Sequence, residues 1–249
     1  MTKSVNEVVG EYVRSDAFKS LAYSSQRQYS QALEHFELRF RSRDIKRIKR
    51  SEINTLLQEL QATPAMANRM ARVISVLFSY AIDHNYVSAN PTSRLKKMKT
   101  GSWAKWSLDE VQKVIALKDR VVSTAVALAW YTGQRESDVL RMRWDSISNG
   151  TISVRQFKTD KVVLIKIHPD LAQYLKTIEH VGSYIVSGDE PMSKARFRKK
   201  FMSKIAEVGL EHRVFYGIHK GFASSLVDAG APNINENDAK LIGTPPQSD

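Results

Sequence analysis

The stretch of sequence that decides the fold is YTGQRESDVLRMRWDSI, residues 131–147. It follows an apolar helical run that begins near Val121, and Thr132-Gly133 has the composition of a helix end. Arg135 then stands at the start of a new helical segment. A guanidinium is planar and permanently charged, so it can hold two oxygens of one phosphate group. An isolated arginine at a helix start more often makes an ordinary salt bridge, so the surrounding sequence has to decide its role.

The residues that follow predict a β-hairpin. GTISVRQF (150–157) and KVVLIKIH (161–168) alternate in polarity and are rich in β-branched residues, with Lys158-Thr159-Asp160 as a polar turn between them. A lysine at a hairpin tip can act as a proton donor. The plainer interpretation of Lys158 is a solvated turn residue.

The rest of the chain reads as helices. Ser4 and Glu7 form a candidate capping box at the first of them. One further stretch, GSYIVSG around Tyr184, is expected to be a short buried strand. The expected helical segments are 4–38 (with a second helix over 24–40), 51–60, 64–84, 121–131, 169–178, 193–208, 217–229 and one that starts at Ser107.

Two boxes resemble the conserved boxes of the tyrosine recombinases, the phage-integrase family. The hairpin fits the family pattern Gln-x-Lys-Thr-x-Lys, with Lys158 as its lysine, and LFSYAIDHNYVSANP (77–91) resembles the end of the family's core-binding domain. The resemblance implies that Arg135 binds the scissile phosphate and that Lys158 protonates the leaving 5′-oxygen. It also implies chemistry that needs no cofactor and no metal. The residues that match the first box are Thr132, Gly133, Arg135, Asp138, Leu140 and Trp144.

The same resemblance predicts a mainly α (α+β) fold in two domains. Residues 1–95 form a helical core-binding (SAM-like) DNA-binding domain, and residues 96–106 a basic linker. Residues 107–249 form a tyrosine-recombinase catalytic-type domain with a small antiparallel β-sheet, C-terminally incomplete. Trp103 and Trp106 flank this linker, and we expect them to anchor it by hydrophobic contacts rather than to stack on DNA.

The sequence departs from the family pattern in its last third. Tyr216 stands where the family has a histidine, and His219 stands where it has a second phosphate-binding arginine. A histidine is only partly charged near neutral pH and lacks the guanidinium fork. Leu241-Ile-Gly-Thr244 stands where a Leu-Gly-His motif is expected, and no tyrosine follows it. We therefore expect the nucleophile to be absent and DNA cleavage to be lost.

Composition and charge favour a nucleic-acid partner. The 249 residues contain no cysteine, which excludes disulfides and thiolate metal sites, and carry a net charge of +12. No apolar run is long enough for a membrane span. Residues 1–100 hold 17 Lys+Arg against 9 Asp+Glu, so the N-terminal part is the more basic. The expected contacts to the DNA backbone are Arg39, Arg41, Arg43, Lys46, Arg47, Lys49, Arg50, Lys96, Lys97, Lys99 and Lys220.

Three functions stay open on the sequence. The first is a DNA-binding protein of this family, acting in site-specific recombination or integration of double-stranded DNA without cleaving it. The second is an active recombinase in its full-length form. The third is a helical regulator or scaffold, which the presence of both Arg135 and Lys158 disfavours. We expect a cytoplasmic protein of a bacterial or phage-infected cell, monomeric in solution, which assembles, if at all, on DNA.

Overall fold

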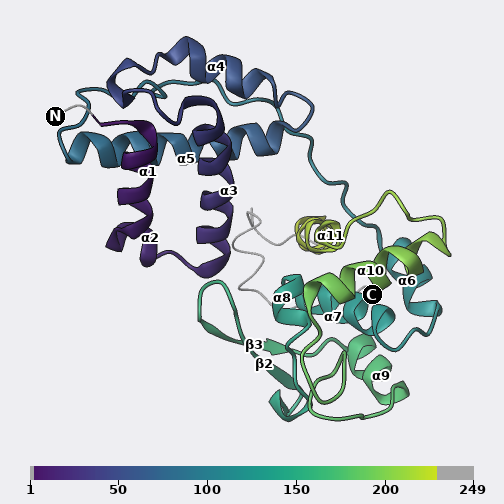
Figure 1. The fold of residues 1–249 in the computed structure, drawn as a ribbon. Helices are drawn as coiled ribbons and strands as arrows, with labels where there is room; N and C mark the ends of the chain where they lie inside the picture. The colour runs from purple at the N-terminus through teal and green to yellow at the C-terminus, as the bar shows by residue number, and fades with distance from the viewer. Residues whose placement is uncertain (1–2, 229–249) are drawn as a thin grey trace. The chain divides into compact units, whose positions relative to one another are not determined.

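The computed structural model describes residues 3–228, which are mostly helical with one small antiparallel sheet (Figure 1). The predicted mainly α fold class is therefore confirmed. The chain divides into two compact units, residues 1–101 and 102–249, and each is described by itself. The domain boundary within residues 96–106 stays a proposal.

The first unit is an all-helical bundle around one apolar core. The long helices α3 and α5 pack against each other, and α1 packs against both. Phe36 and Phe78 are fully buried and meet edge to face at 6.3 Å in this core. Its helices are α1 (Val5–Arg14), α2 (Asp16–Lys19), α3 (Tyr23–Phe40), the 3-10 turn η1 (Ile45–Arg47), α4 (Arg50–Gln58) and α5 (Pro64–Asp83).

The predicted helical stretch 4–38 is broken into three helices. The capping box of Ser4 and Glu7 is present, as predicted. Ser15 then leaves the helical conformation, and its side chain accepts a hydrogen bond from the backbone N–H of Phe18, which starts α2. Serine competes for local backbone groups in this way, and hydrophobic periodicity alone does not reveal it.

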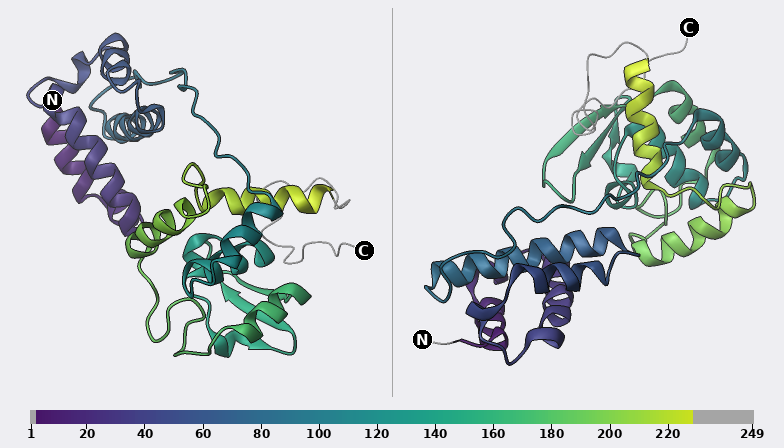
Figure 2. Two further views of the ribbon diagram at one scale, coloured as in Figure 1. Left: turned by 90° about the vertical axis from the view of Figure 1, so that its right-hand side faces the viewer. Right: turned by 90° about the horizontal axis from the view of Figure 1, so that it is seen from above.

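The second unit is arranged around the buried helix α7 (Val122–Thr132). Every residue of α7 is buried, and α6, α8, α9, α10 and α11 all contact it (Figure 1, Figure 2). A helix that is apolar all round belongs at the centre of a core. The surrounding helices are α6 (Leu108–Ala116), α8 (Glu136–Val139), α9 (Pro169–Thr177), α10 (Lys194–Ala206) and α11 (Tyr216–Asp228), with the 3-10 turn η2 (Trp144–Ser146).

The predicted hairpin is confirmed as part of a three-stranded antiparallel sheet. Strand β2 (Thr151–Arg155) pairs with β3 (Val162–Lys166) in the register Ser153↔Leu164, and β1 (Ile147–Ser148) adds on the other side of β2. The strand predicted around Tyr184 is wrong. Tyr184 forms only isolated bridges with Arg143 and Gly188, because Gly188 turns the chain back at φ +89°.

Gly133 ends α7 in a left-handed conformation, with φ +62°. A β-carbon built at this position would lie 2.2 Å from the ring of Phe222 on α11. Only glycine combines this backbone angle with such a close approach. The glycine that ends the apolar run therefore also allows α11 to pack beside the loop that carries Arg135.

Trp106 anchors the start of the second unit, as predicted for the pair of tryptophans, whereas Trp103 is 59% exposed. The indole N–H of Trp106 donates to the carbonyl of Val214 at 3.0 Å, and its backbone N–H donates to the carbonyl of Gly217. A β-carbon at Gly217 or Gly221 would lie 2.3 Å from backbone oxygens of Ala104 and Trp106. The two glycines thus form a close-fitting groove on α11 for this segment.

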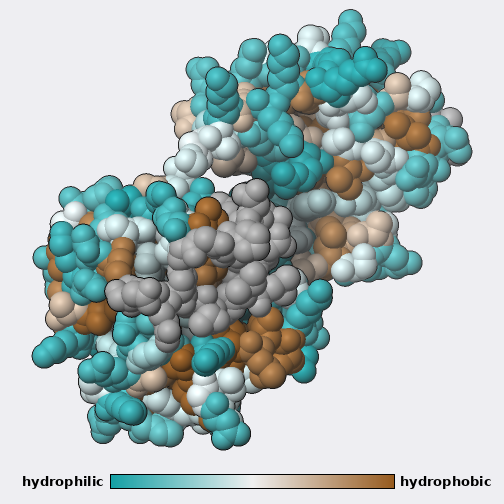
Figure 3. Space-filling view, turned by 180° about the vertical axis from the view of Figure 1, so that it is seen from behind, coloured by the Kyte–Doolittle hydropathy of each residue, from teal (hydrophilic) through white to brown (hydrophobic). Residues whose placement is uncertain are grey.

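Hydrophilic residues prevail over most of the face in Figure 3, with separate apolar patches between them. None of the helices within residues 3–228 is long and apolar enough to cross a membrane.

Candidate active site and nucleic-acid interface

A pocket of about 200 Å³ in the second unit is lined by Arg135 of the first sequence box and by its neighbours Gln134, Glu136 and Ser137. Its walls come from the α7–α8 loop, from α10 and from the first turn of α11. The lining residues are Ala129, Gln134, Arg135, Glu136, Ser137, Lys194, Arg198, Phe215, Tyr216 and His219.

Arg135 is the N-cap of α8, which agrees with its predicted place at a helix start. Its side chain is half-buried, and within residues 3–228 no hydrogen bond or ion pair to its guanidinium is present. A partly buried cation without a protein partner in this range has its hydrogen-bond donors free for a ligand. An anion with several oxygens, such as a phosphodiester, fits these donors.

Tyr216 and His219, the two degenerate positions, line the same pocket as Arg135. They lie in the first turn of α11, with ring centroids 6.0 Å apart. His219 is 3% exposed, whereas Tyr216 is 42% exposed. The fold therefore brings together three of the four predicted catalytic positions. The Leu241–Thr244 prediction lies outside the described residues.

Lys158, the fourth position, is exposed in the hairpin turn and is not a lining residue. Its neighbours are nevertheless tied to the Arg135 loop. The backbone N–H of Phe157 donates to Asp138 Oδ1 at 2.9 Å, and Gln156 Nε2 donates to Gln134 Oε1 at 3.0 Å. Both acceptors are buried. The start of the turn is thus fixed relative to α8.

Two lining cations were missed by the sequence analysis, Lys194 and Arg198 of α10. Arg198 pairs with Glu136, the residue next to Arg135: its Nε donates to Oε1 at 3.1 Å and its Nη2 to Oε2 at 3.2 Å. No short motif joins positions 62 residues apart. The only sequence signal was the density of cations in KARFRKKF, residues 194–201.

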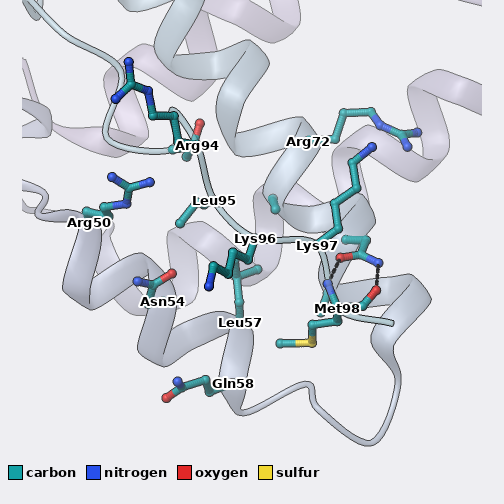
Figure 4. Close-up of a pocket in the computed structure, with 14 residues that line it drawn as sticks. Arg50, Asn54, Leu57, Gln58, Arg72, Arg94, Leu95, Lys96, Lys97 and Met98 are labelled. Carbon is teal, nitrogen blue, oxygen red and sulfur yellow. Dashed lines mark hydrogen bonds between the residues drawn. The ribbon is translucent and has the colours of Figure 1, made fainter. Parts of the chain in front are cut away.

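The first unit contains a larger pocket, of about 490 Å³, between α4, α5 and the segment 92–98 (Figure 4). Asn68 of α5 fixes this segment, because its amide donates to the carbonyl of Met98 and its carbonyl oxygen accepts from the Met98 N–H. No carboxylate lines the pocket. Its cations are Arg50, Arg72, Arg94, Lys96 and Lys97.

This basic pocket includes three of the predicted DNA contacts and adds two that sequence reasoning missed, Arg72 and Arg94. Arg94 adopts a left-handed backbone conformation with φ +61°. A non-glycine residue in that region costs about 1 kcal/mol or more and is found often at functional positions. Arg50 donates to the carbonyl of Ser93, beside Arg94. The fold therefore concentrates positive charge that lies scattered along the sequence.

Several cations of the run 39–50 already have acidic partners. Arg39 pairs with Glu59 at 2.6 Å, and Arg43 pairs with Glu52. The hydrogen bond from Arg43 is the main reason why the pKa of the Glu52 carboxyl lies below its usual value. These pairs reduce the charge that the run offers to a polyanion. Within residues 3–228, the predicted contacts outside the basic pocket that are exposed and have no acidic partner are Arg41, Lys46, Lys49 and Lys99.

Two family models match the chain over most of its length. Residues 107–234 match the phage integrase family, and residues 5–98 match the phage integrase central domain. The chain belongs to the phage integrase family. Its catalytic-type unit carries Arg135 and the hairpin, and its central domain carries the basic pocket. A comparison with curated protein sequences gives no match.

The fold of this integrase-family chain is shared by solved structures of low sequence identity. A lambda integrase dimer bound to a COC′ core site is 20% identical, with a TM-score of 0.83 over 97% of this chain and 95% of that one. The Tn1549 transposon integrase in complex with a circular intermediate DNA is 14% identical, with a TM-score of 0.77 over 95% and 90%. The XerH site-specific recombinase bound to a palindromic difH substrate is 16% identical, with a TM-score of 0.68 over 87% and 72%.

Proposed function

We infer that this chain binds double-stranded DNA and acts in site-specific DNA recombination or integration. The observation that carries the inference is the Arg135 pocket, a half-buried guanidinium without a protein partner within residues 3–228, in a chain of the phage integrase family. The related structures named above are DNA complexes, which supports the same partner.

The roles follow from chemistry. Arg135 binds a phosphodiester, because its fork can hold two phosphate oxygens while negative charge develops. Lys158, carried by the hairpin turn that Asp138 fixes, donates a proton toward a leaving oxygen or contacts the backbone. The basic pocket of the first unit holds phosphates of the DNA backbone, so its cations set affinity and not sequence preference.

The finer proposal is that the chain binds DNA without forming a phosphotyrosyl bond. It rests on the residues present at positions 216 and 219, where the family resemblance expects a histidine and an arginine. The second candidate, an active recombinase, has one observation in its favour: Tyr216 is partly exposed and lines the same pocket as Arg135. A hydroxyl so placed would be the first candidate for an unrecognised nucleophile.

One experiment separates these candidates. The full chain is incubated with DNA that flanks its own gene, and the sample is split between a native and a denaturing gel. We expect a shifted band on the native gel that disappears on denaturation. An adduct that survives denaturation and is lost in Tyr216→Phe would replace the binding-only proposal by the active one. Absence of a shift with any duplex would refute both.

Self-association belongs to the same proposal. A related lambda integrase structure is a tetramer bound to a Holliday junction. We infer that this chain is monomeric in solution and associates on DNA, which light scattering with and without a duplex will test. A stable dimer in the absence of DNA would contradict it.

A further inference from the structure

The Arg135 pocket has a second guanidinium that does not come from α11. Of its lining residues, Arg135, Lys194 and Arg198 are cations and Glu136 is the one carboxylate. The pocket therefore carries an excess of positive charge at neutral pH, whatever the state of His219. An excess of this sign around a small cavity favours an anionic occupant.

Arg198 is held in a defined orientation by its pair with Glu136. Two of its donors, on Nε and Nη2, face the carboxylate of Glu136. A guanidinium has five N–H groups, so three remain for another acceptor. The side chain of Glu136 is 14% exposed and that of Arg198 is 65% exposed, so the carboxylate lies beneath and the guanidinium faces solvent at the rim.

This arrangement leads to a specific role for α10. Position 219 holds a buried histidine, which lacks a guanidinium fork, and α10 supplies a guanidinium to the same pocket. We propose that Arg198, oriented by Glu136 and assisted by Lys194, is a phosphate-binding residue that contacts the same phosphodiester as Arg135. The proposal rests on the proposed function, since that function places the phosphodiester in this pocket.

A purely structural role for Arg198 predicts something different. The ion pair with Glu136 also links α10 to α8, and a pair whose guanidinium faces solvent contributes little to stability. If this link were the only role of Arg198, its loss would lower the free energy of unfolding slightly and leave the affinity for anions unchanged. A matched control is Arg196, an exposed cation on the same helix that does not line the pocket.

The test observes the arginine Nε–H signals of the full ¹⁵N-labelled chain by NMR during titration with inorganic phosphate, and then with a short DNA duplex. We expect the Arg135 and Arg198 signals to shift together, with one dissociation constant. Charge-assisted hydrogen bonds to one phosphate predict that Arg198→Ala weakens binding roughly tenfold. The affinity of Arg196→Ala should remain within about twofold of that of the wild type, since the variant removes only a solvent-screened charge that does not line the pocket.

A compensating variant makes the test sharper. His219→Arg places a guanidinium on α11. Combined with Arg198→Ala, it should restore most of the affinity that Arg198→Ala loses. Introduced alone, it should add little to the affinity of the wild type. Arg198→Lys keeps the charge without the fork, so its affinity should lie between that of the wild type and that of Arg198→Ala. If Arg198→Ala proves poorly folded in thermal unfolding, the Arg198→Lys and His219→Arg results decide.

The outcomes distinguish the two proposals. If Arg135 responds to phosphate and duplex but Arg198 does not, the proposed function stands and the role of Arg198 is refuted. Equal effects of Arg198→Ala and Arg196→Ala would refute it as well. If neither Arg135 nor Arg198 responds to the duplex, the proposed function fails together with this inference.

Discussion

At the scale of single residues, Gly133 joins two requirements that no other amino acid meets. Its φ of +62° is disfavoured for residues with a β-carbon, and that carbon would collide with the Phe222 ring. Gly133→Ala should lower the free energy of unfolding by about 2–4 kcal/mol, the sum of left-handed strain and overpacking. Urea denaturation of the full chain measures this loss.

Gly150 provides the control for the collision. It has a φ of +70°, but a β-carbon there meets nothing within 4 Å. Gly150→Ala should therefore show the strain alone, about 1–2 kcal/mol. Equal losses for the two variants would mean that α11 yields to the added methyl group, and that Gly133 is needed only for its backbone angle.

Tyr131 gives a prediction for alkaline pH. Burial, together with the Asp170 carboxylate that accepts its hydroxyl at 3.3 Å, raises the pKa of Tyr131 from 10.0 to about 12. As the pH rises, the unfolded chain therefore loses the Tyr131 proton before the folded chain does. The stability that the protonated hydroxyl contributes is intact below pH 10 and is lost as the pH rises to about 12.

The comparison with Tyr131→Phe isolates this contribution. Between pH 10 and 12 the wild type should lose free energy of unfolding relative to the variant, as measured by urea denaturation at each pH. Groups that titrate in both proteins contribute equally to the two free energies of unfolding, so their contributions cancel in the difference. A difference that stays constant across this range would show that Tyr131 titrates in the fold as it does in the unfolded chain.

At the scale of elements, Asp138 couples the hairpin to the α8 loop. Its Oδ1 accepts the Phe157 N–H, and no hydrogen bond to its Oδ2 is present within residues 3–228. Asp138→Ala should speed amide exchange of Phe157 on the order of tenfold, because the acceptor of its partly buried hydrogen bond is removed. Hydrogen-exchange NMR measures this rate. Asp138→Asn keeps the Oδ1 acceptor and should exchange at nearly the wild-type rate; equal rates in both variants would exclude the coupling.

The elements also show how far sequence reasoning reaches. The apolar run and its terminal glycine predicted α7, and alternation predicted the hairpin, because both patterns are local. Lys194, Arg198, Arg72 and Arg94 escaped notice because separate helices and the segment 92–98 carry them to their pockets. The pairing of Arg43 with Glu52 was equally hidden, since it depends on how α4 follows the basic run.

At the scale of the whole molecule, charge predicts how DNA binding depends on salt. Each phosphate that a cation neutralises contributes a slope of about −0.9 to log K against log salt for B-DNA. Arg94→Ala and Arg72→Ala should each reduce the slope by about one and weaken binding equally on all sequences. Fluorescence anisotropy at several salt concentrations measures the slope.

Lys19 is the matched control, because it is exposed in the same unit but lies outside the basic pocket. Lys19→Ala should leave the slope unchanged. If Arg94→Ala changed binding to one sequence and not to others, the basic pocket would read bases and the assignment to backbone phosphates would be wrong.

The groove on α11 that receives Trp106 has a practical consequence for dissecting this protein into fragments. The family match of the second unit begins at residue 107, but Gly217 and Gly221 are shaped to hold residues 104–106. A fragment that starts at residue 107 would leave this apolar groove open to solvent, so we expect it to aggregate on expression. A fragment that starts at residue 102 retains residues 104–106, which fill this groove, and should stay in solution. Size-exclusion chromatography of the two fragments will test this.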